Sequence, residues 1–140
     1  MSAEKIVGER TRKILEDLAE RMIPSGGLDY PGARDIGLVD KLLARAGRYR
    51  FEVFALKAMA WLWEISPLFH LKFKLLSQMN PQEQIQYFEG WENSRFMVKR
   101  YILIGLKAPF MAVFYNEPAI WEKIGFAPGN CYEKVGEAKK

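Results

Sequence analysis

Residues 51–65, with the sequence FEVFALKAMAWLWEI, constrain the fold of this chain more than any other segment. Only Glu52, Lys57 and Glu64 interrupt an otherwise apolar run, so a helix over about Tyr49–Ile65 has almost no polar side to present to water. A helix of this kind lies at the centre of its fold or is covered by a partner. The rest of the chain, or a second protein, must therefore cover it.

The length of the chain limits how that cover can be built. A chain of 140 residues has a common length for one domain with one core. We expect a single helical domain over 1–140, with short flexible ends at about 1–5 and 133–140.

The charged residues argue against some partners and compartments. Lys and Arg number 21 against 17 Asp and Glu, and the net charge of +4 is spread along the chain rather than gathered in one block. Nucleic-acid binding usually needs a concentrated basic face, so we expect no nucleic-acid partner. The first 18 residues hold neither an apolar export segment nor paired arginines. We therefore expect a cytoplasmic chain, periplasmic only if a partner carries it.

Apolar residues at helical spacing, separated by proline and glycine, predict an all-α fold. The first helix, over about 4–22, should bury one stripe made of Ile14, Leu15, Leu18, Ala19 and Met22. After a turn over residues 25–35, with Asp35 as the expected N-cap, the second helix runs to Gly47. That helix should bury Leu38, Val39, Leu42, Leu43 and Ala46.

After the helix over about Tyr49–Ile65, the next two predicted helical segments each have a proline in their first turn. Ser66 and Pro67 predict an N-cap and a first-turn proline that open a further helical segment through Met79. Residues 80–83, with the sequence NPQE, give a stronger signal, because the glutamate can reach back to the backbone amide of the cap. The helix that starts there carries, at helical spacing, Ile85, Phe88 and Trp91.

Two further helices complete the expected bundle. One spans about 96–115, and Pro109 should kink or split it because the ring removes a backbone donor. Its most apolar part, residues 101–115, is shorter than the roughly 20 residues of a membrane-spanning helix. A last short helix over 118–124 should stop at Gly125. The sequence thus predicts an all-α, single-domain bundle of about six helices with short connections.

The residues that carry chemistry form no recognisable catalytic set. His70 is the only histidine and has no second nitrogen or thiolate at ligand spacing, so we expect it to be structural or exposed. Cys131 is the only cysteine, which excludes an intrachain disulfide, and we interpret it as a loop thiol. Glu89, Glu92 and Arg95 lie three residues apart and predict an ion-pair ladder rather than acid–base carboxylates. We expect no catalytic residue, bound metal or cofactor in this chain.

Aromatic residues make up 14% of the chain, with nine Phe, six Tyr and four Trp. Large rings are the usual anchors of protein interfaces, because they bury much area while losing few rotamers. Core packing accounts for some of these rings, and a partner surface is a candidate for the others.

Three segments together resemble a known protein family. LSQMNPQEQIQYFEGWENSR (76–95) is followed by FYNEPAIWEKIGFAPG (114–129), and RMIPSGGLDYPGARDIGLVDKLL (21–43) precedes both. They are similar to the small helical module associated with glucose-methanol-choline flavoprotein dehydrogenases; a related module occurs as the small subunit of gluconate and glucose dehydrogenases. The resemblance covers roughly Ile14–Tyr132. This sequence departs from the family where it lacks a twin-arginine signal and has Phe114-Tyr115 in place of paired tyrosines.

The resemblance implies an accessory subunit that does no chemistry and that clasps, stabilises or helps to mature a larger FAD-containing oxidoreductase. FAD would lie in that partner, which would act on alcohol or sugar-type substrates. The residues implied to bind the partner are Trp91, Ser94, Arg95, Tyr115, Pro118, Trp121 and Phe126. Within this set, Pro118 fixes a helix start so that the neighbouring rings are presented as anchors.

Two alternatives stay open at this point. Trp121 belongs either to the interface or to the chain's own core, and Trp91, Ser94 and Arg95 either lock a helix end or contact the partner. The competing hypothesis for the whole chain is a stand-alone helical protein that binds a membrane surface or lipid through its apolar third helix. Its headgroup contacts would come from Lys72, Lys74 and Lys107.

Overall fold

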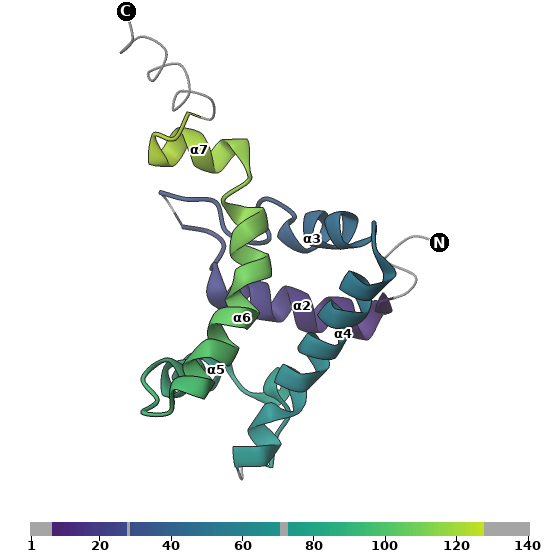
Figure 1. Ribbon diagram of the computed structural model, residues 1–140. Coiled ribbons are helices and arrows are strands. Elements are labelled where there is room, and N and C mark those ends of the chain that lie inside the picture. Colours follow the sequence, from purple (N-terminus) through teal and green to yellow (C-terminus); the bar gives the residue numbers. More distant parts are fainter. Residues whose placement is uncertain (1–6, 28, 71–72, 128–140) are drawn as a thin grey trace, which may run out of the picture.

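The computed structural model describes residues 7–27, 29–70 and 73–127 (Figure 1). The described residues form six α-helices and two short 3-10 helices, and no strand is found among them, which confirms the predicted all-α class. The elements are α2 (Glu9–Met22), α3 (Leu38–Ala46), α4 (Arg50–Ile65), η1 (Ser66–His70), η2 (Leu76–Gln78), α5 (Pro81–Glu92), α6 (Met97–Phe114) and α7 (Pro118–Ile124). The expected flexible ends, Lys72 and Cys131 lie outside the described residues.

The helices share one hydrophobic core (Figure 1). Helix α2 crosses the middle of the bundle and packs against α3 and α4, while α6 packs against α3 and α5. Each α-helix contributes at least one buried side chain to the core; α5 contributes Tyr87 and α7 contributes Ile120. The predicted stripe of α2 is buried except for the half-buried Met22, and all five residues predicted for α3 are buried.

The turn before α3 differs from the expected one at Asp35. This carboxylate does not cap α3 but accepts hydrogen bonds from the backbone N–H groups of Gly32, at 2.7 Å, and Gly26, at 3.3 Å. Helix α3 instead starts after Gly37, which has a φ of 60°. Asp35 was predicted wrongly because its side chain satisfies the amides of its own turn, a use that this residue type makes as readily as helix capping.

The segment after α4 is also not the predicted helix. Ser66 is the C-cap of α4, and its hydroxyl donates to the Trp63 carbonyl at 2.8 Å instead of accepting from a first-turn amide. The chain continues as η1 and then η2, with no α-helix among the described residues of this stretch. Proline at the second position fits a 3-10 turn as well as a helix start, since its fixed φ is common to both.

The later helices follow their predicted signals. Asn80 Oδ1 accepts from the Glu83 amide at 2.8 Å, and Glu83 Oε2 accepts from the Asn80 amide at 2.9 Å, which confirms the capping box. Helix α6 runs through Pro109 without being split. Gly125 ends α7 with a φ of 69°, a left-handed conformation that suits glycine because it has no Cβ.

Candidate functional site

The seven residues predicted to contact a partner fall into two groups at the two ends of α6. Trp91, Ser94 and Arg95 lie at the turn from α5 into α6, and the other four lie at or beyond its C-terminal end. An 18-residue helix is about 27 Å long, so the groups are separated by about that distance. A partner that contacts both groups would have to follow the length of α6.

Trp91 is half-buried and packs inside the chain. Its ring centroid lies 4.8 Å from that of Trp63 and 5.4 Å from that of His70, and the Lys99 ammonium lies 5.4 Å from its centre. Its indole N–H is buried and makes no hydrogen bond of ordinary geometry. The indole N–H lies near the Tyr87 hydroxyl, whose pKa is raised by burial; the contacts with Ser66 and Trp91 offset only part of this effect. These contacts support the helix-end lock for Trp91.

His70 belongs to a polar cluster beside Trp91 that sequence reasoning did not find. Its Nδ1 lies 3.2 Å from the Ser66 carbonyl oxygen and its Nε2 lies 3.0 Å from Lys99 Nζ. The ammonium can only donate, so this contact requires the imidazole to accept at Nε2. Burial raises the pKa of Tyr87, whose hydroxyl donates to Ser66 Oγ at 2.9 Å. The cluster ties η1 to α5 and α6.

Ser94 and Arg95 occupy the turn itself. Ser94 Oγ accepts from the Phe96 amide at 3.2 Å, a local bond that shapes the entry into α6. Arg95 is exposed and forms no ion pair with another described residue. The predicted ladder is wrong, because Glu92 pairs with Lys107 of α6 at 3.2 Å instead of with Arg95. The pairing across two helices depends on their packing, which i, i+3 spacing does not contain.

The C-terminal group is brought together around α7. The indole N–H of Trp121 donates to the Tyr115 carbonyl at 2.7 Å, and the rings of Trp121 and Phe126 are 6.0 Å apart. Pro118 is exposed as the first residue of α7, and Tyr115 and Phe126 are about half exposed. The core residue of this helix is Ile120, whereas Trp121 is half-buried at its edge.

The outer face of α6 joins the two groups. We use this name for five exposed, uncharged residues at helical spacing, Met97, Tyr101, Ile104, Ala108 and Ala112. The opposite side of the helix is buried. An amphipathic helix normally exposes charged or polar residues to water. The composition of this side therefore favours its burial against another apolar surface.

Helix α4 has a second apolar outer face. It consists of the exposed residues Phe51, Phe54, Ala55, Ala58 and Leu62, and Phe51 is 78% exposed. The sequence predicted that this helix is central or covered by a partner. The structure buries only the side with Val53, Leu56, Ala60, Trp63 and Glu64.

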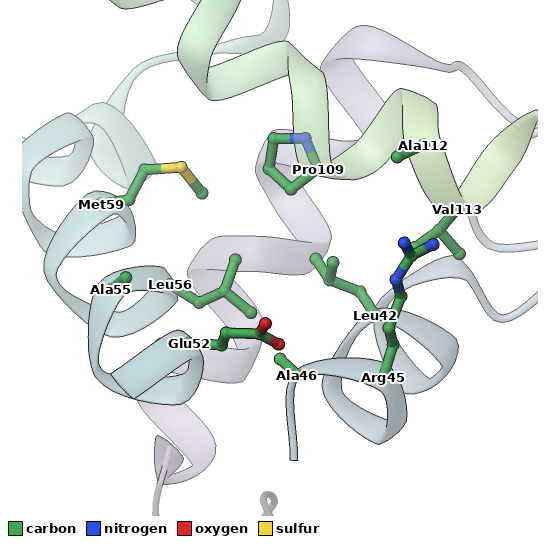
Figure 2. A pocket seen from close by; sticks show the side chains of 10 residues that line it. All are labelled: Leu42, Arg45, Ala46, Glu52, Ala55, Leu56, Met59, Pro109, Ala112 and Val113. Carbon is green, nitrogen blue, oxygen red and sulfur yellow. The ribbon is translucent and has the colours of Figure 1, made fainter. Parts of the chain in front are cut away.

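A groove of about 350 Å3 lies between these two helices (Figure 2). One wall comes from α4, the opposite wall from α6, and one end from α3; the lining residues are Leu42, Arg45, Ala46, Glu52, Ala55, Leu56, Met59, Pro109, Ala112 and Val113. Ala55 and Ala112 belong both to the groove and to the outer faces. Through these shared residues the two outer faces adjoin the groove, and we call the three together the α4–α6 surface; it is largely apolar, with Arg45 and Glu52 as its charged groove residues.

A basic pocket adjoins one end of the groove. It has a volume of about 520 Å3 and is lined by Lys41, Ala44, Arg45, Arg48, Val113, Asn116 and Glu117. Lys41 is paired with Glu117, whereas Arg45 and Arg48 are exposed and form no ion pair with another described residue. Because Arg45 and Val113 line both the groove and this pocket, the guanidinium groups of Arg45 and Arg48 lie next to the largely apolar groove.

Within the described part of the chain, no group of three or more His, Cys, Asp or Glu side chains is placed to hold a metal ion. No described helix is both long and apolar enough to cross a membrane. Comparisons with family models, with curated proteins and with solved structures found no match to this chain.

We predict that the isolated chain self-associates through the α4–α6 surface. Replacing Phe54, which is 68% exposed, with glutamate should lower the associated fraction without lowering the melting temperature, because the side chain contributes little to the core. Sedimentation over a range of concentrations measures the association. Gln86→Glu on the exposed side of α5 is the control. A wild-type chain that stays monomeric at high concentration would contradict the prediction.

Proposed function

We propose that this chain is a non-catalytic accessory subunit of a larger, FAD-dependent oxidoreductase of the glucose-methanol-choline family. It would bind that flavoprotein and stabilise it or help it to mature, while FAD and the alcohol or sugar-type substrate bind to the partner. The observation that carries the proposal is the α4–α6 surface, on which two neighbouring helices expose apolar faces. The resemblance of residues 21–43, 76–95 and 114–129 to the small helical module of that family supplies the kind of partner.

The composition of this surface supports a protein partner. Interface cores are depleted in charge and enriched in aromatic residues and Met, and a few large anchors carry most of the binding energy. Phe51, Phe54 and Tyr101 are exposed rings of this kind. Their exposure in the free chain means that burial against a partner removes apolar area from water, which favours association.

Several polar side chains of the types that enzymes use in catalysis serve here to hold the chain together. Both ring nitrogens of His70 have partners, and the buried Glu64 carboxylate accepts hydrogen bonds from the amide and hydroxyl of Ser77. Gln84 donates from its side-chain amide to the carbonyls of Leu76 and Met79. Such satisfied groups are typical of a structural network, which supports a subunit without catalysis of its own.

Affinity purification of the full chain from its native host tests the proposal. A much larger chain should co-purify, show the absorption of bound flavin, contain a dinucleotide-binding glycine fingerprint, and oxidise an alcohol or sugar with an artificial electron acceptor. The chain purified alone should show neither the chromophore nor the activity. Adding it back to the separated flavoprotein should raise the flavoprotein's melting temperature, since a ligand of the native state stabilises it.

Several results of these experiments would contradict the proposal. Turnover or bound flavin in the isolated chain would contradict a non-catalytic role. Co-purification of a chain without flavin, or a flavoprotein whose melting temperature does not respond to added subunit, would contradict the accessory role.

The α4 outer face also favours a second candidate, binding to a membrane surface. Exposed Phe51, Phe54 and Leu62 lie on a helix that carries Arg50 and Lys57, an arrangement compatible with an interfacial helix. Of the lysines predicted for headgroup contacts, Lys74 and Lys107 are engaged in ion pairs with Glu83 and Glu92. Sedimentation with anionic vesicles separates the candidates, because an accessory subunit should remain in the supernatant.

A further inference from the structure

We infer that the groove between α4 and α6 holds an amphipathic helix of the flavoprotein partner, with apolar side chains in the groove and a carboxylate against Arg45 and Arg48. This inference rests on the proposed function and names the part of the partner that the α4–α6 surface recognises. It is carried by the shape of the groove, by its helical walls and by the charges at one end.

The walls of the groove favour a helix over an extended segment. Both walls are α-helices, in which the backbone N–H and C=O groups are already paired along the chain. An extended segment docked between them would find no sheet edge, so only water and side chains could pair with its backbone groups. A helix satisfies its backbone internally and can present apolar side chains at i, i+3 and i+4 to the groove. In Figure 2 Met59 and Leu56 stand on one wall and Pro109 and Val113 on the other.

The charges at the groove fix the chemistry of the docked helix. Arg45 and Arg48 are exposed cations of the basic pocket with no ion pair to a described residue, and guanidinium groups bind carboxylates in a two-pronged geometry. Glu52 lies on the α4 wall and would repel a carboxylate placed there. Because Glu52 lies beside Ala46 of α3 (Figure 2), the acidic residue of the partner helix should lie toward Arg45 and Arg48 and away from Glu52.

Other occupants fit the groove less well. A small molecule needs a site that covers most of its surface, whereas Ala55 and Ala112 of the groove walls are exposed to solvent. A second copy of this chain, which we expect to associate through the outer faces when no partner is present, carries the same net charge of +4, which opposes binding in the groove beside the basic pocket. An acidic helix has neither disadvantage.

Filling the groove tests its use directly. Ala112→Trp places a large ring at an exposed position of the α6 wall, so the isolated chain should keep its helicity and melting temperature while the Kd for the purified flavoprotein rises by about tenfold or more. Gln86→Trp adds the same ring to α5 outside the groove and should leave the Kd unchanged. Equal binding by both variants would overturn the inference.

Charge reversal tests the carboxylate. The double variant Arg45→Glu with Arg48→Glu should weaken binding of the flavoprotein by about tenfold and reduce the dependence of the association rate on salt. The double variant Lys13→Glu with Lys57→Glu makes the same change of net charge outside the groove, and should have a much smaller effect. An equal loss in both double variants would show a general effect of net charge and would contradict an acidic residue at Arg45 and Arg48.

Photo-crosslinking identifies the occupant. A benzophenone amino acid at Ala55 or Ala112 in the complex should crosslink to a helical, acidic segment of the flavoprotein, and the same probe at Gln86 should not. Crosslinks to a second copy of this chain, to lipid, or to a segment without acidic residues would each overturn the inference. If the flavoprotein binds but crosslinks only at other surfaces, the proposed function stands and the inference fails. If no flavoprotein binds, both fail.

Discussion

Replacing Trp63 with alanine should lower the free energy of unfolding of the isolated chain by about 3 to 5 kcal/mol, the range for truncating a large aromatic residue in a core. Trp63 is 2% exposed, and its ring contacts those of Phe88 and Trp91 at centroid distances of 5.5 and 4.8 Å. The substitution removes these contacts and leaves a cavity between α4 and α5. Denaturation with urea, followed by circular dichroism, measures the loss, and Trp63→Phe should lose less.

Trp121→Ala is the matched comparison, because it removes the same side chain from the edge of the bundle. Trp121 is half-buried, and its indole N–H bonds only to a backbone carbonyl at the end of α6. We expect a loss of about 1 kcal/mol in unfolding free energy and a weakening of flavoprotein binding by roughly 2 kcal/mol, as for an interface anchor. If the two tryptophans cost the isolated chain equally, Trp121 is a core residue and not a docking residue.

Replacing Gly32 with alanine should lower the free energy of unfolding by about 2 to 3 kcal/mol, the upper part of the usual range for forcing an extra carbon into a packed site. Gly32 is buried, and a Cβ added there would collide with the Pro24 carbonyl oxygen and with the backbone of Ser25. These are backbone atoms, which cannot move aside as the end of a flexible side chain can. The turn would have to open, and its hydrogen bond from Gly32 to Asp35 would be strained.

Gly105→Ala is the control for Gly32→Ala, because it makes the same chemical change in the middle of α6. An added Cβ at Gly105 meets no other atom, and alanine is the better helix former. The free energy of unfolding should rise by about 1 kcal/mol. Thermal melting of the two variants beside the wild type checks the opposite signs, and equal shifts would show that the collision at Gly32 is relieved without cost.

Much of the local structure could be predicted from the sequence, because the interactions that decide it lie within one turn of helix. Asn80 and Glu83 form their capping box from residues three apart, and Gly125 ends α7 through its own backbone freedom. The buried sides of α2 and α3 also follow from spacing alone, since the period of the helix decides which residues share a side. These features together predicted the all-α bundle.

Local patterns failed where one residue type has several partners of similar energy. The Asp35 carboxylate could accept from amides of its own turn or cap the helix that follows. The Ser66 hydroxyl could accept from an amide at a helix start or donate to a carbonyl at a helix end. Glu92 was predicted to pair with Arg95 on its own helix, yet it pairs with Lys107 of the neighbouring one. Each of these choices depends on which groups the packed chain places nearest, and these energy differences are small.

The sequence alone therefore determined most of the helices, the start of α5, the end of α7, and the presence of a helix with too few polar residues to face water on its own. Only the tertiary structure decided how that helix is covered: one side packs on α2 while the other stays open beside α6. The groove and its basic end come from three helices, α3, α4 and α6, whose lining residues are as far apart in the chain as Leu42 and Val113. Helix periodicity says which side of each helix is apolar, but the crossing of the helices decides which apolar sides meet and which remain exposed.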